Sequence, residues 1–246
     1  HYYLIACIYL DQNSLVIIIG VPQLRDKRMS NFKMESVLDF VKENAISGDP
    51  QSVLDTIDSY AMDGSLDQKR FLMNIGPEKG KILVDTIKKN KSKKILELGS
   101  FLGYSAVLIG MSIDDDGELI SVDPDPNSIA IASQLVEFAG LSSKVSFIKS
   151  KAEHAINDLD RSFDLIFIDH AKKRYFPDLL LLENSGLVKK NTIIFADNVG
   201  LFKSDMTEYF KHVRDSNFYT SSNIGSKLEY RDSIYDAVEI SVRIKD

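Results

Sequence analysis

The stretches Asp164-Leu-Ile-Phe-Ile-Asp169 and Thr192-Ile-Ile-Phe-Ala-Asp197 are short apolar runs that each end in an acidic residue. Continuous apolar runs of this length are typical of strands buried in the middle of a parallel sheet. In an open α/β sheet, ligands bind outside the carboxyl ends of such strands. Two neighbouring strands would therefore bring Asp169, Asp197 and the adjacent Asn198 to one cleft. Because Mg²⁺ prefers carboxylate and amide oxygens, we expect these three residues to bind a magnesium ion.

From about residue 94 onward, strand-like and helix-like stretches alternate along the chain. The expected strands, besides the two runs above, are residues 95–98, 119–123 and 145–150. This alternation, with its clearest helix at residues 127–138, predicts an α/β fold with a mostly parallel sheet and helices on both faces. The end of the chain differs, because residues 227–230 and 237–244 are strand-like and separated by a short turn. They predict an antiparallel hairpin at the edge of the sheet.

The composition is that of an ordinary globular protein, with 44% hydrophobic and 27% charged residues in a chain of 246. The formal charge of -6 argues against nucleic acid as the main partner, because a phosphate backbone attracts positively charged surfaces. Cys7 is the only cysteine, so the chain forms no intrachain disulfide. A fold that depends on its own core suits a reducing compartment, and we expect a cytoplasmic location.

Residues 1–30 form a separate N-terminal apolar segment. Two apolar runs within it are interrupted by Asp11-Gln-Asn-Ser14, and the second is followed by basic residues. Because the chain starts at His1, we interpret it as a fragment or a processed form. The segment is either a truncated membrane anchor or signal peptide, or an extra strand or tail, and neither run reaches the ~20 apolar residues of a membrane span. We expect residues 31–246 to form a single domain.

A glycine-containing loop, Glu97-Leu-Gly-Ser-Phe-Leu-Gly103-Tyr-Ser105, follows the first strand of the predicted sheet. Glycine lets the backbone turn tightly and approach a ligand closely. The spacing of Gly99 and Gly103 is neither that of dinucleotide-binding proteins nor that of a phosphate-binding loop, which disfavours a nicotinamide dehydrogenase. We therefore expect a cofactor without a pyrophosphate. A packing turn between strand and helix is the alternative.

Asp123 ends the second strand, about twenty residues beyond this loop, where an acidic residue typically accepts hydrogen bonds from ribose hydroxyls. The alternative is a capping or turn residue before Pro124 and Pro126. The combination with the glycine loop favours ribose binding.

His170 and Lys172 come directly after Asp169. A loop lysine is usually only solvated, but a lysine beside a metal ion loses its proton more readily and can act as a base. Lys172 is therefore the candidate base. Glu229, which we expect inside a strand, is most simply a solvent-facing residue, and it gains a role only if the edge hairpin folds over the cleft.

Together these motifs resemble the animal catechol O-methyltransferases, which are class I S-adenosylmethionine-dependent enzymes. The likeness runs from about residue 40 to the C-terminus, and its segments include Gly48-Asp-Pro-Gln-Ser-Val-Leu54, Leu96-Glu-Leu-Gly99, Gly103-Tyr-Ser-Ala-Val107, Asp169-His170, Lys172, Ala196-Asp-Asn-Val199 and Leu228-Glu-Tyr230. The resemblance implies a Rossmann-like, seven-stranded sheet with one antiparallel strand at the edge. It also implies Mg²⁺-dependent transfer of a methyl group from S-adenosylmethionine to one hydroxyl of a catechol-like substrate.

Carried over by position, the resemblance also implies roles for individual residues. The cofactor-binding set would be Ile75, Glu97, Gly99, Tyr104 and Ser105 at the methionine end, Asp123 at the ribose, and Ala152, Glu153 and His170 at the adenine, together with Asp169. Magnesium would be bound by Asp169, Asp197 and Asn198. The substrate would meet Lys172 as the base, Asn198, and Glu229 as the acceptor for its second hydroxyl.

Departures from the family pattern concern the substrate ring and the adenine. The positions of the aromatic walls are Phe71, Ala171 and Phe202, and the chain has no tryptophan, so the preferred catechol is open. Ala152 replaces a serine, which we expect to remove one hydrogen bond worth on the order of 1 kcal/mol. Two alternatives stay open: an enzyme for other vicinal-dihydroxy aromatics such as phenylpropanoid thioesters, and a catalytically weak cofactor-binding scaffold. The retained metal, base and acceptor residues argue against the scaffold.

Overall fold

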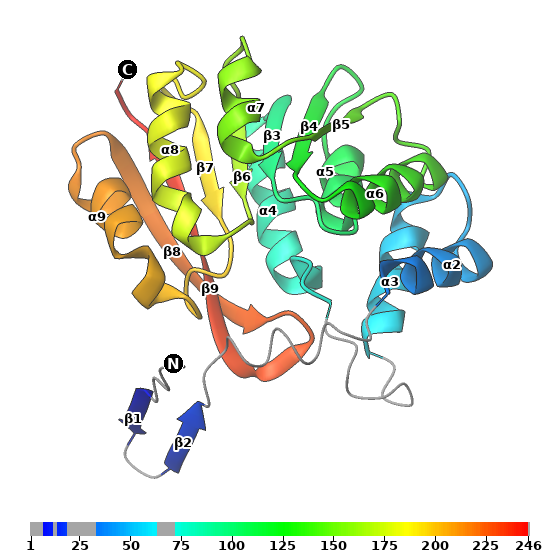
Figure 1. The fold of residues 1–246 in the computed structure, drawn as a ribbon, viewed down its shortest axis with the longest axis horizontal. Coiled ribbons are helices and arrows are strands. Elements are labelled where there is room, and N and C mark those ends of the chain that lie inside the picture. Colours follow the sequence, from blue (N-terminus) through cyan, green and yellow to red (C-terminus); the bar gives the residue numbers. More distant parts are fainter. Residues whose placement is uncertain (1–6, 12–13, 19–32, 63–71, 246) are drawn as a thin grey trace.

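The computed structural model describes residues 7–11, 14–18, 33–62 and 72–245 (Figure 1). Its centre is a seven-stranded sheet in the order β5-β4-β3-β6-β7-β9-β8. The strands are β3 (Lys94–Leu98), β4 (Glu118–Asp123), β5 (Val145–Lys149), β6 (Leu165–Ile168), β7 (Ile193–Ala196), β8 (Tyr219–Leu228) and β9 (Arg231–Arg243). A separate antiparallel pair consists of β1 (Cys7–Asp11) and β2 (Ser14–Ile18).

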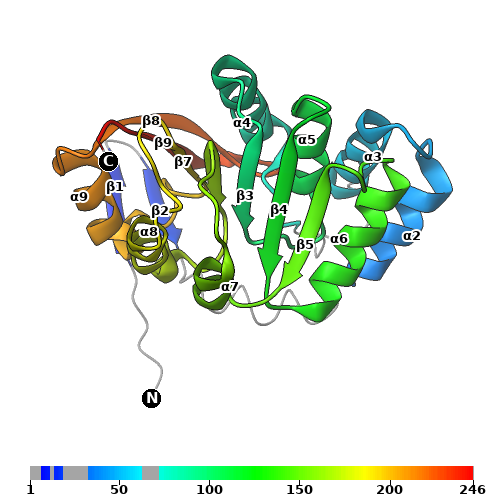
Figure 2. The same ribbon diagram turned by 90° about the horizontal axis from the view of Figure 1, so that it is seen from above.

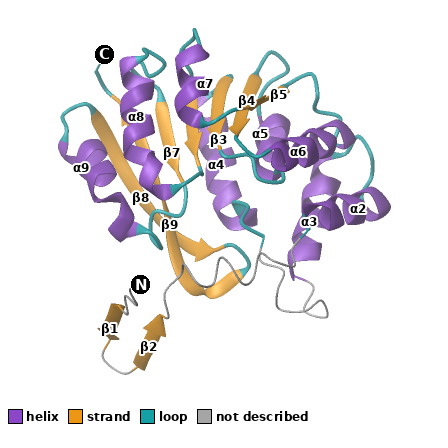
Figure 3. Ribbon diagram, viewed as in Figure 1, coloured by secondary structure: helices purple, strands orange, loops and turns teal. Residues whose placement is uncertain are grey.

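Helices cover both faces of the large sheet, as Figures 2 and 3 show. They are α2 (Met34–Asn44), α3 (Pro50–Met62), α4 (Gly76–Asn90), α5 (Tyr104–Ser112), α6 (Pro126–Phe138), α7 (Ala152–Asp158), α8 (Tyr175–Asn184) and α9 (Thr207–Asp215), with the short 3-10 helices η2 (Lys172–Arg174) and η3 (Lys203–Met206). Among the described residues, none of these helices has the length and apolar character that crossing a membrane requires.

The strands β5, β4, β3, β6 and β7 pair in parallel, which confirms the predicted parallel sheet. The predicted edge hairpin is also present, but its strands are longer than residues 227–230 and 237–244. Most of β8 is exposed and polar, so its sequence lacks the apolar alternation that would have revealed it. The antiparallel strand β9 is second from the edge rather than outermost, since β8 pairs with its outer side.

Successive side chains of each central strand enter two different cores, because side chains alternate across a sheet. On β6, Phe167 packs with α4 and α5 on one face, and Ile168 packs with α8 and α9 on the other. Phe167 meets Phe195 of β7 edge-to-face, with ring centroids 5.7 Å apart. Burial on both faces is why these strands are continuous apolar runs.

The parallel register brings the chemical residues to one edge of the sheet. Just beyond the strand ends, Gly99 donates to Val122 at 2.8 Å, Asp169 to Leu98 at 2.9 Å, and Asp197 to Ile168 at 3.1 Å. These backbone hydrogen bonds fix the carboxyl ends of β4, β3, β6 and β7 relative to one another. The predicted convergence of Asp169 and Asp197 at neighbouring strand ends follows directly from this register.

Candidate functional site

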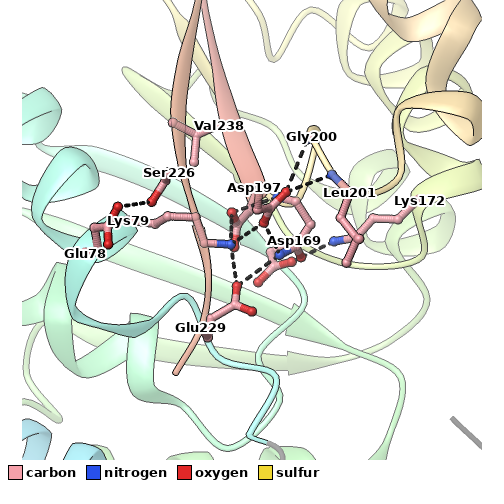
Figure 4. A network of polar contacts seen from close by, with 12 residues as sticks. Glu78, Lys79, Asp169, Lys172, Asp197, Gly200, Leu201, Ser226, Glu229 and Val238 are labelled. Carbon is pink, nitrogen blue, oxygen red and sulfur yellow. Dashed lines mark hydrogen bonds and ion pairs between the residues drawn. The ribbon is translucent and has the colours of Figure 1, made fainter. Parts of the chain in front are cut away.

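A buried lysine lies at the centre of an acidic cluster (Figure 4). The ammonium nitrogen of Lys79, from α4, is 2.7 Å from Oδ1 of Asp197 and 2.8 Å from Oδ2 of Asp236, and it also binds Oε1 of Glu229. Lys79 is only 1% exposed. Burial by itself would lower its pKa, but the three neighbouring carboxylates outweigh burial and raise the pKa of Lys79 above its ordinary value. Lys79 is therefore a fixed positive charge in the site.

Asp236, from β9, connects this cluster to the loop after β7. Its Oδ2 accepts a hydrogen bond from Nδ2 of Asn198 at 3.0 Å, and its Oδ1 accepts from the backbone N–H groups of Gly200 and Leu201 at 3.2 and 3.0 Å. Nδ2 of Asn198 also donates to Oε1 of Glu229 at 2.9 Å. Both contacts of Asn198 use its amide nitrogen, so its amide oxygen is directed away from these two carboxylates.

The candidate base lies beside the other predicted metal residue. Nζ of Lys172 donates to Oδ1 of Asp169 at 2.9 Å and to the hydroxyl of Tyr175 at 2.7 Å. That hydroxyl in turn donates to the backbone carbonyl of Asp197 at 3.1 Å. The ammonium also lies 5.9 Å from the ring centroid of Phe202, one of the predicted wall positions. Of the other two, Ala171 is exposed and Phe71 lies outside the described residues.

Among the described residues of this site, acidic groups outnumber basic ones. The site combines four carboxylates and two ammonium groups, which belong to Asp169, Asp197, Glu229, Asp236, Lys79 and Lys172. Burial is the main reason that the pKa values of Asp197 and Glu229 are raised, and the negative charge of Asp169 raises them further. The positive charge of Lys79 acts in the opposite direction. Oδ2 of Asp197 is buried and has no hydrogen-bond partner among the described residues. With all four carboxyl groups ionised the site carries two surplus negative charges, and this surplus, together with the unpartnered carboxylate oxygen, fits a divalent cation.

The carboxylates that approach one another most closely differ in part from the predicted metal set. Within the described ranges, Asp197, Glu229 and Asp236 each offer an oxygen within 4.8 Å of the others. Asp169 is connected to this group through Lys172 and Tyr175, whose hydroxyl donates to the backbone carbonyl of Asp197. Asn198 is connected to it through its amide contacts with Glu229 and Asp236. The trio Asp169, Asp197 and Asn198 as ligands of one ion stays a prediction.

From the sequence we expected Glu229 inside a strand, but it lies in the turn between β8 and β9. The turn folds over the site, because Glu229 is 6% exposed and binds both Lys79 and Asn198. Its neighbour Tyr230 donates to Oδ1 of Asp58 at 2.7 Å, and Tyr104 donates to Oδ2 of the same aspartate at 3.2 Å. Asp58, in α3, thus connects the hairpin turn to the start of α5. The hairpin turn therefore places Glu229 beside Lys79 and Asn198, and a role of Glu229 towards a substrate stays a prediction.

The predicted cofactor loop surrounds a second buried carboxyl group. Glu97, in β3, is wholly buried and accepts a hydrogen bond from Oγ of Ser121. Burial raises the pKa of Glu97 to about 7, although hydrogen bonds from Ser105 and Ser121 act in the opposite direction. In the described structure Oε1 of Glu97 is buried without a hydrogen-bond partner. A ligand that carries an ammonium group would satisfy it.

Asp123 holds the glycine loop in place. Its Oδ2 accepts from the backbone N–H groups of Ser100 and Phe101 at 3.0 and 3.2 Å, and its Oδ1 accepts from the N–H of Asp125 at 2.9 Å. The turn role considered for Asp123 is therefore present, whereas the helix cap of α6 is Asp125. Ribose binding by Asp123 stays a prediction.

The residues predicted around the adenine lie near the start of α7 and after β6. Ala152 and Glu153 begin α7, and Glu153 forms a 2.6 Å ion pair with Arg174. Nε2 of His170 is 2.7 Å from Oδ2 of the buried Asp178, which Arg174 also binds. Ile75 is buried at the start of α4. The contacts of Arg174 with Glu153 and Asp178 join the start of α7 to α8.

Lys79 and Asp236 were not found from the sequence. A signal existed for Lys79, because it falls on the same face of α4 as Gly76, Gly80 and Leu83, which are all buried. A lysine among apolar residues at helical spacing indicates a buried charge. Asp236 likewise lies two residues from the buried Val238 on β9, on the same side of the strand.

Comparisons with known proteins show which family this chain is similar to. Residues 46–230 match the model of a family described as O-methyltransferase. The catechol O-methyltransferase of Bos taurus is 34% identical over 221 residues, which cover 88% of this chain and 78% of that protein. The transmembrane O-methyltransferase of Homo sapiens is 31% identical over 192 residues, which cover 75% of this chain and 64% of that protein.

Solved structures share the fold at lower identity. The O-methyltransferase from Bacillus cereus, in complex with SAH, has a TM-score of 0.66 at 18% identity, covering 86% of this chain and 100% of that one. TomG from Streptomyces achromogenes, an O-methyltransferase in complex with SAM, has a TM-score of 0.65 at 18% identity, covering 85% and 96%. These likenesses confirm the predicted Rossmann-like fold.

Proposed function

The chain belongs to the O-methyltransferase family, and from this premise we propose that it transfers a methyl group from S-adenosylmethionine to one hydroxyl of a catechol-like substrate in a Mg²⁺-dependent reaction. The observation that carries the proposal is the excess of acidic groups in the site, where a buried oxygen of Asp197 has no partner among the described residues and lies beside Asp169, Asn198 and Lys172. The bovine relative named a catechol O-methyltransferase supports the substrate class.

Asp169, Asp197 and Asn198 would hold the metal ion. Each offers an oxygen of the kind that Mg²⁺ prefers, and an ion with open positions could also accept two adjacent hydroxyls of a substrate. Bound Mg²⁺ would make a coordinated hydroxyl more acidic, and the sulfonium of S-adenosylmethionine would supply the methyl group. The surplus negative charge supports a divalent rather than a monovalent ion.

Lys172, in its neutral amine form, would accept the proton from the hydroxyl that is methylated and would become an ammonium. Its Nζ is oriented by Tyr175 and lies 2.9 Å from Asp169, so a hydroxyl bound beside Asp169 would be within reach of the base. Glu229 would accept a hydrogen bond from the second hydroxyl. Its contacts to Lys79 and Asn198 both use Oε1, and we assign Oε2 to the substrate.

The protein would contribute mainly alignment and exclusion of water. Glu97 would bind the amino group of the cofactor through its unpartnered oxygen, and Asp123 would bind the ribose while it holds the glycine loop. The turn that carries Glu229 covers the site from the other side. Fixing oxygen, methyl group and sulfur in line lowers the barrier by removing their freedom to move. A dry site favours a step in which an anion and a cation neutralise each other.

We also propose that residues 31–246 form one catalytic domain in the cytoplasm, and that residues 1–30 would be the part that contacts a membrane. The name of the human transmembrane relative supports the membrane contact. Much of the segment lies outside the described residues.

The proposal is tested with purified protein, labelled S-adenosylmethionine and a panel of catechols, with monophenols as matched controls. We expect methylation of catechols only, and its loss when a chelator removes divalent ions. Activity that persists after complete metal removal would discard the metal. Cofactor binding without turnover on any vicinal-dihydroxy aromatic would instead favour the scaffold.

A further inference from the structure

The acidic site contains more carboxylates than the proposed metal needs. Asp169 and Asp197 serve as ligands in the proposed function, and Glu229 faces the substrate. Asp236 has no role there, and neither does Lys79. Both are fully buried, at 0% and 1% exposure, where an uncompensated charge is strongly unfavourable. Two opposite charges placed side by side at this depth call for an explanation.

Lys79 selects between the two oxygens of Asp197. Its ammonium binds Oδ1 at 2.7 Å, and Oδ2 is the oxygen that lacks a partner within the described structure. The backbone N–H of Asn198 also donates to Oδ1, at 2.7 Å. A carboxylate held by one oxygen cannot rotate freely, so Lys79 and this N–H together determine which oxygen is presented to a ligand.

Asp236 acts in the same way on Asn198. Its Oδ2 accepts from the amide nitrogen of Asn198 at 3.0 Å, and together with Glu229, which accepts from the same nitrogen at 2.9 Å, it directs the amide oxygen to the opposite side. Its Oδ1 receives the N–H groups of Gly200 and Leu201, so the backbone that follows Asn198 is fixed as well. Asn198 has a positive φ of 55°, and these bonds help to hold it there. The 2.8 Å ion pair between Asp236 and Lys79 joins the two arrangements.

We propose that Lys79 and Asp236 are a pair of positioning residues for the metal site, which present Oδ2 of Asp197 and Oδ1 of Asn198 to the divalent ion. The inference rests on the proposed function, because it concerns the same ion. Neither residue touches the substrate. Their effect passes through the orientation of the two ligands, as hydrogen-bond partners of ligands do at other metal sites.

A simpler role would be charge alone, and the two roles predict opposite results for one variant. If Lys79 only contributes a positive charge, Lys79→Met makes the site more negative and tightens cation binding. If Lys79 positions Asp197, the same variant weakens cation binding in spite of the added negative charge. Asp236→Asn weakens binding under both roles. The double variant changes no net charge, so charge alone predicts wild-type affinity, whereas positioning predicts a weak site.

The experiment measures binding of Mn²⁺, by the electron paramagnetic resonance signal of the free ion, to the full-length wild type and these three variants. We expect Mn²⁺ affinity to fall about 10- to 100-fold in Lys79→Met, in Asp236→Asn and in the double variant. The controls Lys81→Met and Asp232→Asn change exposed residues of the same two segments and should bind as the wild type does. Unchanged affinity for S-adenosylmethionine reports that a variant is folded.

Tighter binding by Lys79→Met, or wild-type affinity in the double variant, would overturn the inference and leave the proposed function intact. A wild type that binds no Mn²⁺ would overturn both. If Lys79→Met does not fold, the double variant decides between the two roles. It removes the buried lysine together with one of the carboxylates that the lysine neutralises, so it leaves no additional unpaired charge.

Discussion

The α-carbon of Gly99 packs directly against the backbone of Asp169. A β-carbon added at Gly99 would lie 2.8 Å from the carbonyl carbon of Asp169 and 3.2 Å from the backbone nitrogen of His170. Gly99 also has a φ of 107°, which side chains rarely tolerate. The end of β3 and the end of β6 can therefore approach only because this residue is glycine. This contact sets the distance between the predicted cofactor loop and the predicted metal residue.

Gly99→Ala is expected to damage both stability and ligand binding. The backbone strain alone costs on the order of 1–3 kcal/mol, and the clash with Asp169 adds to it. Gly48→Ala is the matched control, since Gly48 has a φ of 82° but no atom within 4 Å of an added β-carbon. Urea unfolding should show a larger loss for Gly99→Ala than for Gly48→Ala, and Mn²⁺ affinity should fall only in the former. Equal losses in the two variants would mean that the contact with Asp169 is unimportant.

The central sheet could be predicted from sequence because its strands are buried on both faces and are therefore continuous apolar runs. Because each of these runs ends in an acidic residue, Asp169 and Asp197 could be predicted at the ends of neighbouring strands. β8 could not be predicted over its full length, since an exposed edge strand needs no apolar face. Lys79 and Asp236 were missed because their partners lie far apart in the chain. The spacing of Lys79 on α4 could have indicated that it is buried, but it could not have indicated which carboxylates surround it.

Lys172→Met is expected to remove most of the turnover and to leave cofactor binding unchanged. Loss of a general base typically lowers kcat by about 10²- to 10⁴-fold. Lys173→Met is the matched control, because the neighbouring lysine is exposed and has no place in the site. The measurement is kcat from labelled methyl transfer together with the Kd for S-adenosylmethionine. Full turnover in Lys172→Met would remove this residue from its proposed role.

Tyr230→Phe is expected to weaken substrate binding more than cofactor binding. Its hydroxyl donates to Asp58 at 2.7 Å and accepts from Nδ2 of Asn74 at 2.9 Å, and the preceding residue in the turn is Glu229. Removing the hydroxyl takes this partner away from Nδ2 of Asn74 and from Oδ1 of Asp58, at a cost of roughly 1–3 kcal/mol in stability. We expect a higher KM for the catechol with kcat retained at saturation. Tyr235→Phe, at a hairpin position that is 64% exposed, is the control, and a KM equal in both variants would contradict the anchoring role.

Glu97 is expected to make both stability and cofactor affinity depend on pH. Burial raises its pKa from 4.5 to about 7 in the folded protein. A group whose pKa is raised by folding stabilises the fold below its unfolded pKa, and that contribution is lost as the pH rises through the folded pKa. The wild type should therefore lose roughly 3 kcal/mol relative to Glu97→Gln between about pH 4.5 and pH 7, at 1.36 kcal/mol per pH unit.

Cofactor binding should show the opposite trend, because the amino group of S-adenosylmethionine favours the charged carboxylate of Glu97. Affinity measured by calorimetry should increase from pH 5.5 to pH 8 in the wild type, with release of a proton on binding at the lower pH values. Glu97→Gln should lack this increase, whereas Glu137→Gln, at an exposed position of α6, should follow the wild type. If Glu97→Gln and the wild type have the same pH profile, then the unpartnered oxygen of Glu97 does not receive the amino group, and the methionine end of the cofactor must be bound elsewhere.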